Sequence, residues 1–169
     1  MNKYIINALA RPGKMAQSIY ESLMPNGLYK DFGVKVIPYG NEKPTDGMYA
    51  ITPDLYAIHG WSFANQAAKT HLDKTMGAAS IIFGHIHRIQ SYVRHNPMTG
   101  SAVGAWSFGA LAKNNMFYQK GQPNDHCNGF GIVQTDGKYF NVITIPVLKD
   151  GSDEMVVLPN GETLRVRNG

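Results

Sequence analysis

The sequence predicts an α/β fold with a mixed sheet, and two patterns support this class. Two short apolar runs bounded by turn residues, Leu55–Ile58 and Ser80–Phe83, are typical of buried strands. Between them, residues 64–74 suit a helix that Ser62 is expected to cap and Gly77 to end. A crossover helix of this length favours parallel, neighbouring strands. After this unit the pattern becomes mostly β.

Turn signals predict the remaining elements. An amino-terminal helix, a Val34–Tyr39 strand and a Met48–Ile51 strand are expected first, separated by clusters of turn residues. Three hairpins follow, which pair Gln90–Arg94 with Ser101–Ala105, Ile132–Val133 with Tyr139–Phe140, and Met155–Leu158 with Thr163–Val166. The chain shows no internal repeat, low-complexity tract or charge block, so residues 1–169 are predicted to form a single domain.

Composition indicates an ordinary globular protein. The chain has 43% hydrophobic and 17% charged residues, and its 169 residues are enough to bury about two-thirds of the unfolded surface. The formal charge of +4 permits an anionic partner, nucleic acid included, but the basic residues are scattered and form no dedicated nucleic-acid arm.

We expect a cytoplasmic protein without a membrane segment. No early stretch resembles a secretion signal, and no run approaches the roughly 20 apolar residues of a membrane span. The single cysteine, Cys127, excludes an intramolecular disulfide framework and fits a reducing compartment. Beside His126 this thiol is a candidate ligand or nucleophile, although packing is the simpler interpretation.

Three histidines follow the two central strands and indicate a metal site. His59 directly follows one strand, while His85 and His87 follow the other in the segment Gly84-His85-Ile86-His87. In an extended backbone, positions i and i+2 point to one side, so both rings are expected to face the same way. Open α/β sheets place ligands at the carboxyl ends of their strands. Neutral imidazoles gathered there suit zinc, manganese or iron.

These motifs resemble the calcineurin-like metallophosphoesterases, a two-metal superfamily that includes small bacterial and phage enzymes. The likeness rests on His59-Gly60 and Gly84-His85-Ile86-His87, and extends more loosely over residues 3 to 147. It implies a fold that is the carboxyl-terminal half of a four-layer α/β/β/α sandwich, with a mixed sheet and helices on one face. Residues 148–169 lie outside the likeness and are expected to form an accessory β-hairpin tail.

The resemblance implies that His59 and His85 bind one metal and His87 the other, with Mn, Fe, Zn or Ni as the divalent ions. The superfamily normally opens with Asp-X-His, Gly-Asp-X-X-Asp and Gly-Asn-His-Asp/Glu, and this sequence contains none of them. The remaining ligands and the catalytic histidine are therefore missing. A dinuclear centre is expected only if an amino-terminal half is supplied, and the chain alone should bind at most one metal weakly.

Two further residues are candidates for substrate binding. Arg88 directly follows His87 and is placed to meet a phosphate, although a solvated strand face accounts for it equally well. His126 lies in a loop before the closing strands, and such loops approach the active-site edge in related phosphoesterases. Of the other histidines, His71 is expected to pack or to face solvent within its helix, and His95 to be exposed.

Two function classes remain open. The first is a hydrolase, a metal-dependent phosphoesterase acting on phosphate mono- or diesters, which is inactive or very weak without its companion fragment. The second is a non-catalytic remnant that acts as a binding or assembly module. Half a sandwich exposes sheet, so association with an amino-terminal fragment or with a second copy is expected in either case.

Overall fold

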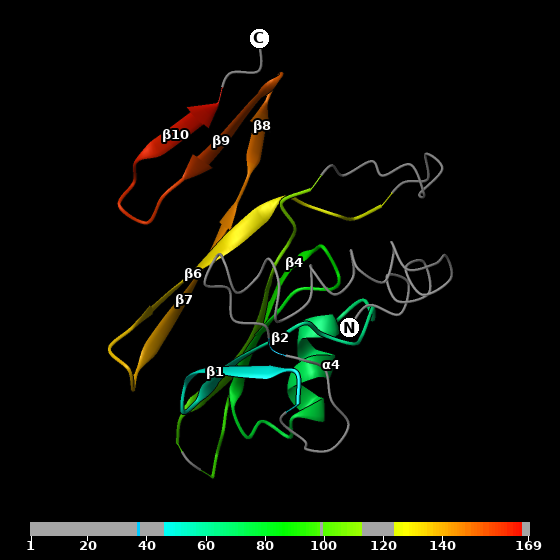
Figure 1. Cartoon of the computed structure of the whole chain (residues 1–169), viewed down its shortest axis with the longest axis vertical. Coiled ribbons are helices and arrows are strands. Elements are labelled where there is room, and N and C mark those ends of the chain that lie inside the picture. Colours follow the sequence, from blue (N-terminus) through cyan, green and yellow to red (C-terminus); the bar gives the residue numbers. More distant parts are fainter. Residues whose placement is uncertain (1–36, 38–45, 99, 113–123, 167–169) are drawn as a thin grey trace, which may run out of the picture. The chain divides into compact units, whose positions relative to one another are not determined.

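A computed structural model describes residue 37 and residues 46–98, 100–112 and 124–166. The chain divides into two compact units, residues 1–48 and residues 49–169. That residues 1–169 form a single domain stays a prediction. Almost all of the first unit lies outside the described residues. The predicted amino-terminal helix and, apart from Ile37, the predicted Val34–Tyr39 strand lie there too. Figure 1 shows the helix and the strands of the described residues.

A five-stranded mixed sheet forms the centre of the second unit. Its strands are β1 (Met48–Thr52), β2 (Leu55–Ile58), β3 (Ser80–Phe83), β4 (Ile89–His95) and β5 (Ala102–Phe108). They lie in the order β1-β2-β3-β5-β4, in which β2, β3 and β5 are parallel and β4 is antiparallel to β5. The predicted parallel pair and the predicted hairpin of β4 with β5 are thereby confirmed.

The crossover helix α4 spans Ala67–Lys74 and begins three residues later than predicted. Ser62 does not cap this helix. Its hydroxyl accepts the N–H of Ala64 at 3.3 Å, and Ala64 precedes the first residue of the helix. The side chain of Gln90 on β4 caps the first turn of the helix instead, since its oxygen accepts the Ala68 N–H at 3.3 Å. A distant strand thus supplies the cap, which local sequence cannot predict. Gly77 (φ 65°) ends the helical segment as expected, and its N–H bonds to the Leu72 carbonyl at 3.1 Å.

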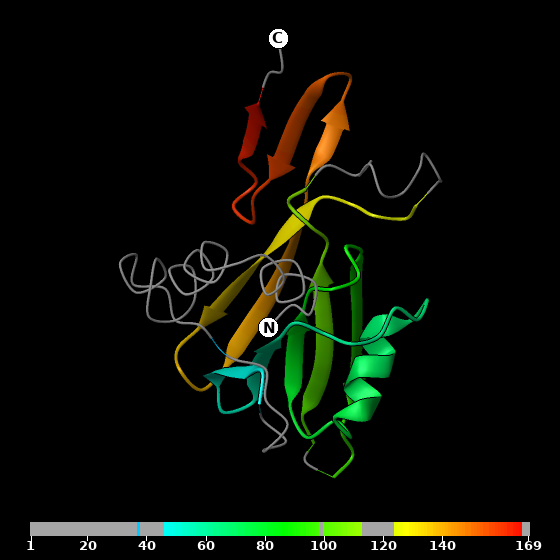
Figure 2. The same cartoon turned by 45° about the vertical axis from the view of Figure 1, so that its right-hand side comes forward.

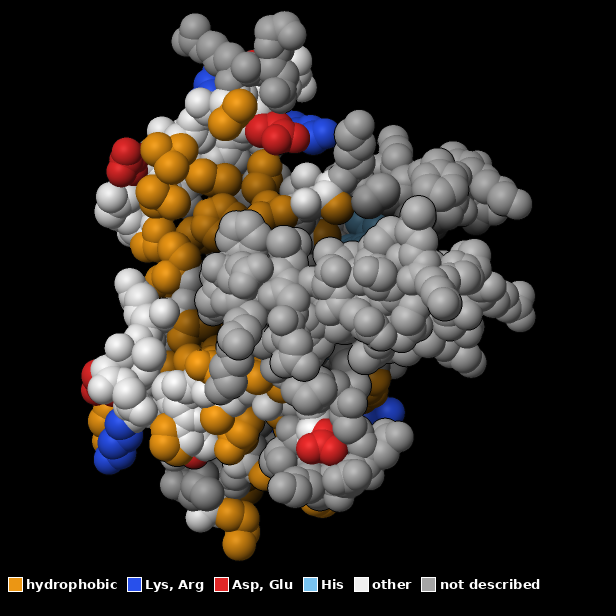
Figure 3. Space-filling view, in the orientation of Figure 1, with side chains coloured by type: hydrophobic (Ala, Val, Ile, Leu, Met, Phe, Trp, Pro, Cys, Tyr) orange, Lys and Arg blue, Asp and Glu red, His pale blue; other side chains and the backbone are white. Residues whose placement is uncertain are grey.

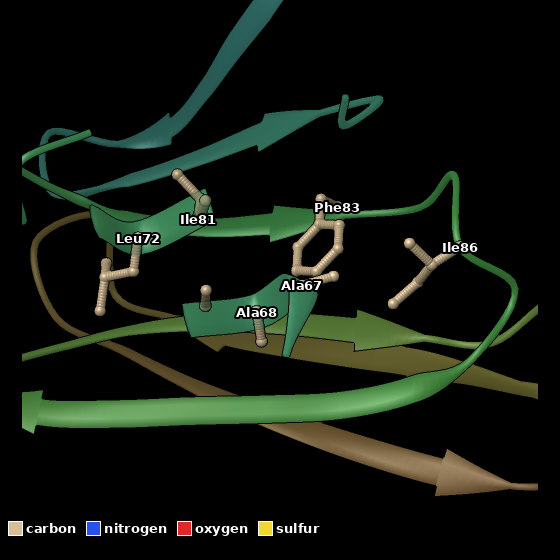
Figure 4. Packing of buried hydrophobic residues seen from close by; sticks show 7 residues of the cluster. Ala67, Ala68, Leu72, Ile81, Phe83 and Ile86 are labelled. Atoms are coloured by element: carbon tan, nitrogen blue, oxygen red, sulfur yellow. The ribbon is translucent and has the colours of Figure 1, made fainter. Parts of the chain in front are cut away.

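The apolar face of α4 packs on one face of the sheet and forms the core. Buried side chains from the helix, from β3 and β5 and from the turn after β3 make up this cluster: Ala67, Ala68, Leu72, Ile81, Phe83, Ile86 and Ala105. Tyr56 and Ile58 lie opposite Ile81 and Phe83 in the register and pack against the same cluster. Figure 4 shows Ile86 beyond the end of β3, next to Phe83, so the turn that carries the two histidines is anchored in the core.

The opposite face of the sheet is covered by the hairpin of β6 (Gly129–Thr135) and β7 (Phe140–Pro146), as Figure 2 shows. Trp106 on β5 meets Phe140 edge to face, with ring centroids 6.4 Å apart. The Phe108 ring lies so close to Gly131 that a Cβ there would come within 2.4 Å of it. Helix, mixed sheet and hairpin therefore form three layers. A fourth layer has no counterpart among the residues described, so the complete four-layer sandwich stays a prediction.

The carboxyl-terminal tail is a three-stranded antiparallel sheet rather than only the predicted hairpin. It consists of β8 (Leu148–Asp150), β9 (Asp153–Val157) and β10 (Thr163–Val166). Arg165 on β10 pairs with Asp150 at 3.0 Å and with Asp153 at 3.6 Å, which ties the third strand to the other two.

Exposed apolar side chains mark this tail. Leu148, Val157, Leu164 and Val166 are between 44% and 62% exposed. Figure 3 shows hydrophobic side chains at the surface over the carboxyl-terminal strands, in the upper left of that view. Among the described residues, no helix has the length and apolar character needed to cross a membrane.

Candidate metal centre

His59 and His85 meet at the carboxyl ends of the adjacent parallel strands β2 and β3. Nε2 of His59 and Nδ1 of His85 are 3.1 Å apart, and the ring centroids are 5.0 Å apart at an interplanar angle of 77°. The backbone couples the two strand ends as well, because the Gly84 N–H donates to the His59 carbonyl at 3.0 Å. The predicted convergence of these two imidazoles on one sheet edge is therefore present.

The turn after β3 separates His85 from His87, contrary to our expectation. His85 (φ 67°) and His87 (φ 56°) both adopt the left-handed backbone region, so the segment is not extended and the strand rule for i and i+2 does not apply. A tight three-residue turn closes around His85, with the Ile86 N–H donating to the Gly84 carbonyl at 2.7 Å. Left-handed non-glycine residues are costly, and such conformations concentrate at functional sites.

His87 meets a different partner, His126. Their ring centroids are 4.9 Å apart at an interplanar angle of 75°. In the part of the chain that the structure describes, no three histidine, cysteine, aspartate or glutamate side chains gather into one metal-binding group. The four histidines form two pairs instead. The two pairs are still coupled electrostatically, because His59 contributes to the lowered pKa of His87, and His87 contributes to the lowered pKa of His85.

Burial keeps the imidazoles in the form that binds metal. It is the main cause that lowers the pKa of His85 and of His87 below the ordinary value, and neighbouring histidines lower both pKa values further. Neutral imidazole is the species that donates a lone pair to a metal ion. The Nε2 atom of His85 is buried and has no hydrogen-bond partner among the residues that the structure describes. The two nitrogens that lie close enough to share one divalent ion are Nδ1 of His85 and Nε2 of His59, 3.1 Å apart, and Nε2 of His85 would then carry the ring hydrogen.

Arg88 joins three chain segments beneath this edge. Its guanidinium donates to the Asp125 carboxylate at 2.8 Å and to the Phe63 and Ala64 carbonyls at 3.2 and 2.9 Å. The side chain is only 13% exposed, and the hydrogen bond from Arg88 lowers the pKa of Asp125. These contacts hold the loop after β2 and the loop of His126 together. Substrate binding by Arg88 stays a prediction.

His71 is a residue whose positioning role the sequence did not reveal. It is fully buried on α4, and its Nδ1 lies 2.7 Å from the Ala67 carbonyl and must carry the hydrogen. Its Nε2 therefore accepts the Trp61 N–H at 2.9 Å and the Ser62 N–H at 3.4 Å. Because this turn directly follows His59-Gly60, His71 fixes the backbone that carries His59. The sequence did carry one sign that His71 is buried: it lies four and three residues after the apolar Ala67 and Ala68, which places it on the same face of the helix.

Gly60 lies between the His59–His85 pair and the buried side chain of His71. It has φ 102°, and a Cβ there would lie 3.1 Å from the His85 Cβ and 3.2 Å from His71 Nε2. The backbone conformation therefore favours glycine, and a Cβ would be tightly placed against both histidines. This is the local reason that a His-Gly pair, rather than a histidine alone, ends the first strand.

Cys127 contributes packing and backbone contacts. Its Sγ accepts the Ile89 N–H at 3.0 Å, and its own N–H donates to the His87 carbonyl at 3.0 Å. The thiol is partly buried. These contacts agree with the simpler interpretation from the sequence.

A cavity of about 560 Å³ opens at the other end of the sheet. Ser80, Ala102 and Trp106 line it together with residues of β7 and the preceding turn, and none of the four paired histidines does. Its lining offers no convergent set of metal ligands. We therefore assign the candidate site to the histidine edge, where the carboxyl ends of the parallel strands lie. No family model, curated protein or solved structure matches the chain.

Proposed function

We propose that this chain is the carboxyl-terminal half of a metal-dependent phosphoesterase. The observation that carries the proposal is the pair His59 and His85, two imidazoles from the ends of adjacent parallel strands with ring nitrogens 3.1 Å apart. Two nitrogens bound at about 2.0–2.1 Å to one ion lie roughly 3.0–3.4 Å apart. His59 and His85 would hold one divalent ion, and His87 a second. The ion, when bound, would polarise a phosphoryl oxygen and lower the pKa of water.

The chain's own residues would position these ligands and shield them from water. His71 holds the turn after His59, Ile86 anchors the turn between His85 and His87, and Arg88 ties the adjoining loops together. Phe63 covers His85, with ring centroids 3.9 Å apart. The carboxylate ligands and the catalytic histidine of a two-metal site would come from a companion fragment. The substrate class is then a phosphate mono- or diester.

The test is hydrolysis of bis(p-nitrophenyl) phosphate with Mn²⁺, by the chain alone and by the chain mixed with the product of the reading frame directly upstream. We expect near-background hydrolysis from the chain alone and a clear rate from the mixture. The His59→Ala variant should reduce that rate by ~100-fold or more, because it removes a metal ligand. The His95→Ala variant, which changes an exposed histidine at the end of β4, should leave the rate unchanged.

An assembly module is the second candidate, favoured by the exposed apolar side chains of Leu148, Leu164 and Val166 in the tail. The same experiment separates the two. If the upstream frame encodes no Asp-X-His and Gly-Asn-His motifs, or if the mixture hydrolyses neither this phosphodiester nor the monoester p-nitrophenyl phosphate, the phosphoesterase proposal fails and the assembly module is favoured.

A further inference from the structure

The two histidine pairs at the sheet edge have nearly the same ring-centroid separation and interplanar angle. In the first pair, His59 and His85, the ring centroids are 5.0 Å apart at 77°. In the second, His87 and His126, they are 4.9 Å apart at 75°. The four side chains come from three segments: His59 from the end of β2, His85 and His87 from the turn between β3 and β4, and His126 from the loop before β6. Two matching imidazole pairs therefore lie at one edge, where the sequence indicated a pair and a single histidine.

Contacts on both sides hold His126 in place. The preceding residue, Asp125, is bound by Arg88 at 2.8 Å. The following residue, Cys127, donates its N–H to the His87 carbonyl at 3.0 Å, which ties His126 to the backbone of its ring partner. The His126 N–H itself bonds to the Asn124 side chain at 3.0 Å. The loop is thus organised around the position of this imidazole.

The conformation of His87 favours a ligand role for the pair over simple ring packing. The left-handed backbone at His87 is unfavourable for a residue with a side chain, and the buried Ile86 beside it fixes the turn in that form. A packing contact between two aromatic rings does not require this cost. A site that presents two nitrogens to one cation depends on how each ring is directed, and the turn held by Ile86 fixes the direction of the His87 side chain.

We infer that His126 is a metal ligand that shares one divalent ion with His87, so that the chain carries two bis-imidazole half-sites. This rests on the proposed function for the assignment of His87 as a ligand, and it moves His126 from substrate binding to metal binding. The ion is a borderline transition cation such as Zn²⁺ or Ni²⁺, which imidazole nitrogen suits. The sequence alone predicted at most one weakly bound ion, and the second pair raises this to two.

The experiment is a calorimetric titration of the full, chelator-treated chain with Ni²⁺ at pH 7.5. We expect two equivalents for the unmodified chain and one for His126→Ala, with the affinity of the lost site reduced at least ~10-fold. His59→Ala should lose the other equivalent. His95→Ala is the matched control and should keep both. Circular dichroism confirms that each variant folds.

A second measurement needs no variant. In long-range ¹H–¹⁵N spectra of the unmodified chain titrated with Zn²⁺, the ring nitrogens of His87 and His126 should shift together. The inference is overturned if His126→Ala keeps both equivalents, if the unmodified chain binds one ion or none, or if the His126 ring does not respond. These outcomes are separate from the phosphodiester assay: loss of one ion in His126→Ala without hydrolysis by the mixture refutes the function alone, and hydrolysis with unchanged stoichiometry refutes the inference alone.

Discussion

Replacing His71 with alanine should lower the free energy of unfolding by about 4 kcal/mol. His71 is fully buried, and its ring stacks on Phe83 with centroids 4.1 Å apart. The variant loses this packing and leaves the Trp61 N–H without its acceptor. His71→Leu keeps most of the volume, so it should cost about 2 kcal/mol and isolate the hydrogen bonds. Urea unfolding followed by fluorescence measures both variants.

His95→Ala is the control for this series. His95 is exposed at the end of β4, so the free energy of unfolding should change by no more than about 0.5 kcal/mol. The positioning role of His71 also predicts that His71→Leu weakens Ni²⁺ binding at the His59–His85 pair while the His87–His126 pair is less affected. A His71→Leu chain as stable as the unmodified one would show that the hydrogen bonds to Trp61 and Ser62 contribute nothing.

The His71→Leu variant should also change how the stability of the chain depends on pH. Burial lowers the pKa of His71 below its ordinary value of 6.5, although the hydrogen bond to Ala67 raises it in part. Below pH 6.5 the unfolded chain therefore takes up a proton that folded His71 does not, and stability falls as the pH falls. The pKa values of His85 and His87 are lowered in the same direction, so part of the decline persists in His71→Leu. The variant should show a shallower decline between pH 7 and pH 5 than the unmodified chain.

Replacing Gly109 with alanine should lower the free energy of unfolding by about 3 kcal/mol. Gly109 follows β5 with φ 81°, and a Cβ there would come within 2.4 Å of the Cys127 carbonyl oxygen. That oxygen accepts the Ala110 N–H at 3.0 Å, so backbone must move and a hydrogen bond between two chain segments is lost. His126 lies next to the displaced residue. The variant should therefore also weaken metal binding by the His87–His126 pair.

Gly161→Ala is a matched control for Gly109→Ala. Gly161 has φ 83° but nothing within 4 Å of its Cβ position, so this variant carries the backbone cost of about 1 kcal/mol without the crowding. The difference between the two variants in urea unfolding measures the close approach of Gly109 to Cys127. Equal losses of stability would contradict the close contact.

Much of the central sheet was predictable because it depends on local patterns. The apolar runs Leu55–Ile58 and Ser80–Phe83 are the observed strands β2 and β3, and the helix between them makes the pair parallel. The Asp136-Gly137 turn lies between β6 and β7 as expected, because a turn signal between two apolar runs acts over a few residues. The predicted start of α4 was wrong, because the helix is capped by Gln90, which lies 22 residues after Ala68.

The sequence by itself determined that His59 and His85 meet, since parallel neighbouring strands bring their carboxyl ends to the same edge. Only the tertiary structure decided the partners of the other candidates: His87 pairs with His126, Arg88 with Asp125, and His71 with the turn after His59. The physical reason is that these pairings depend on left-handed turns and on contacts between loops distant in the chain. Strand periodicity carries no information about either.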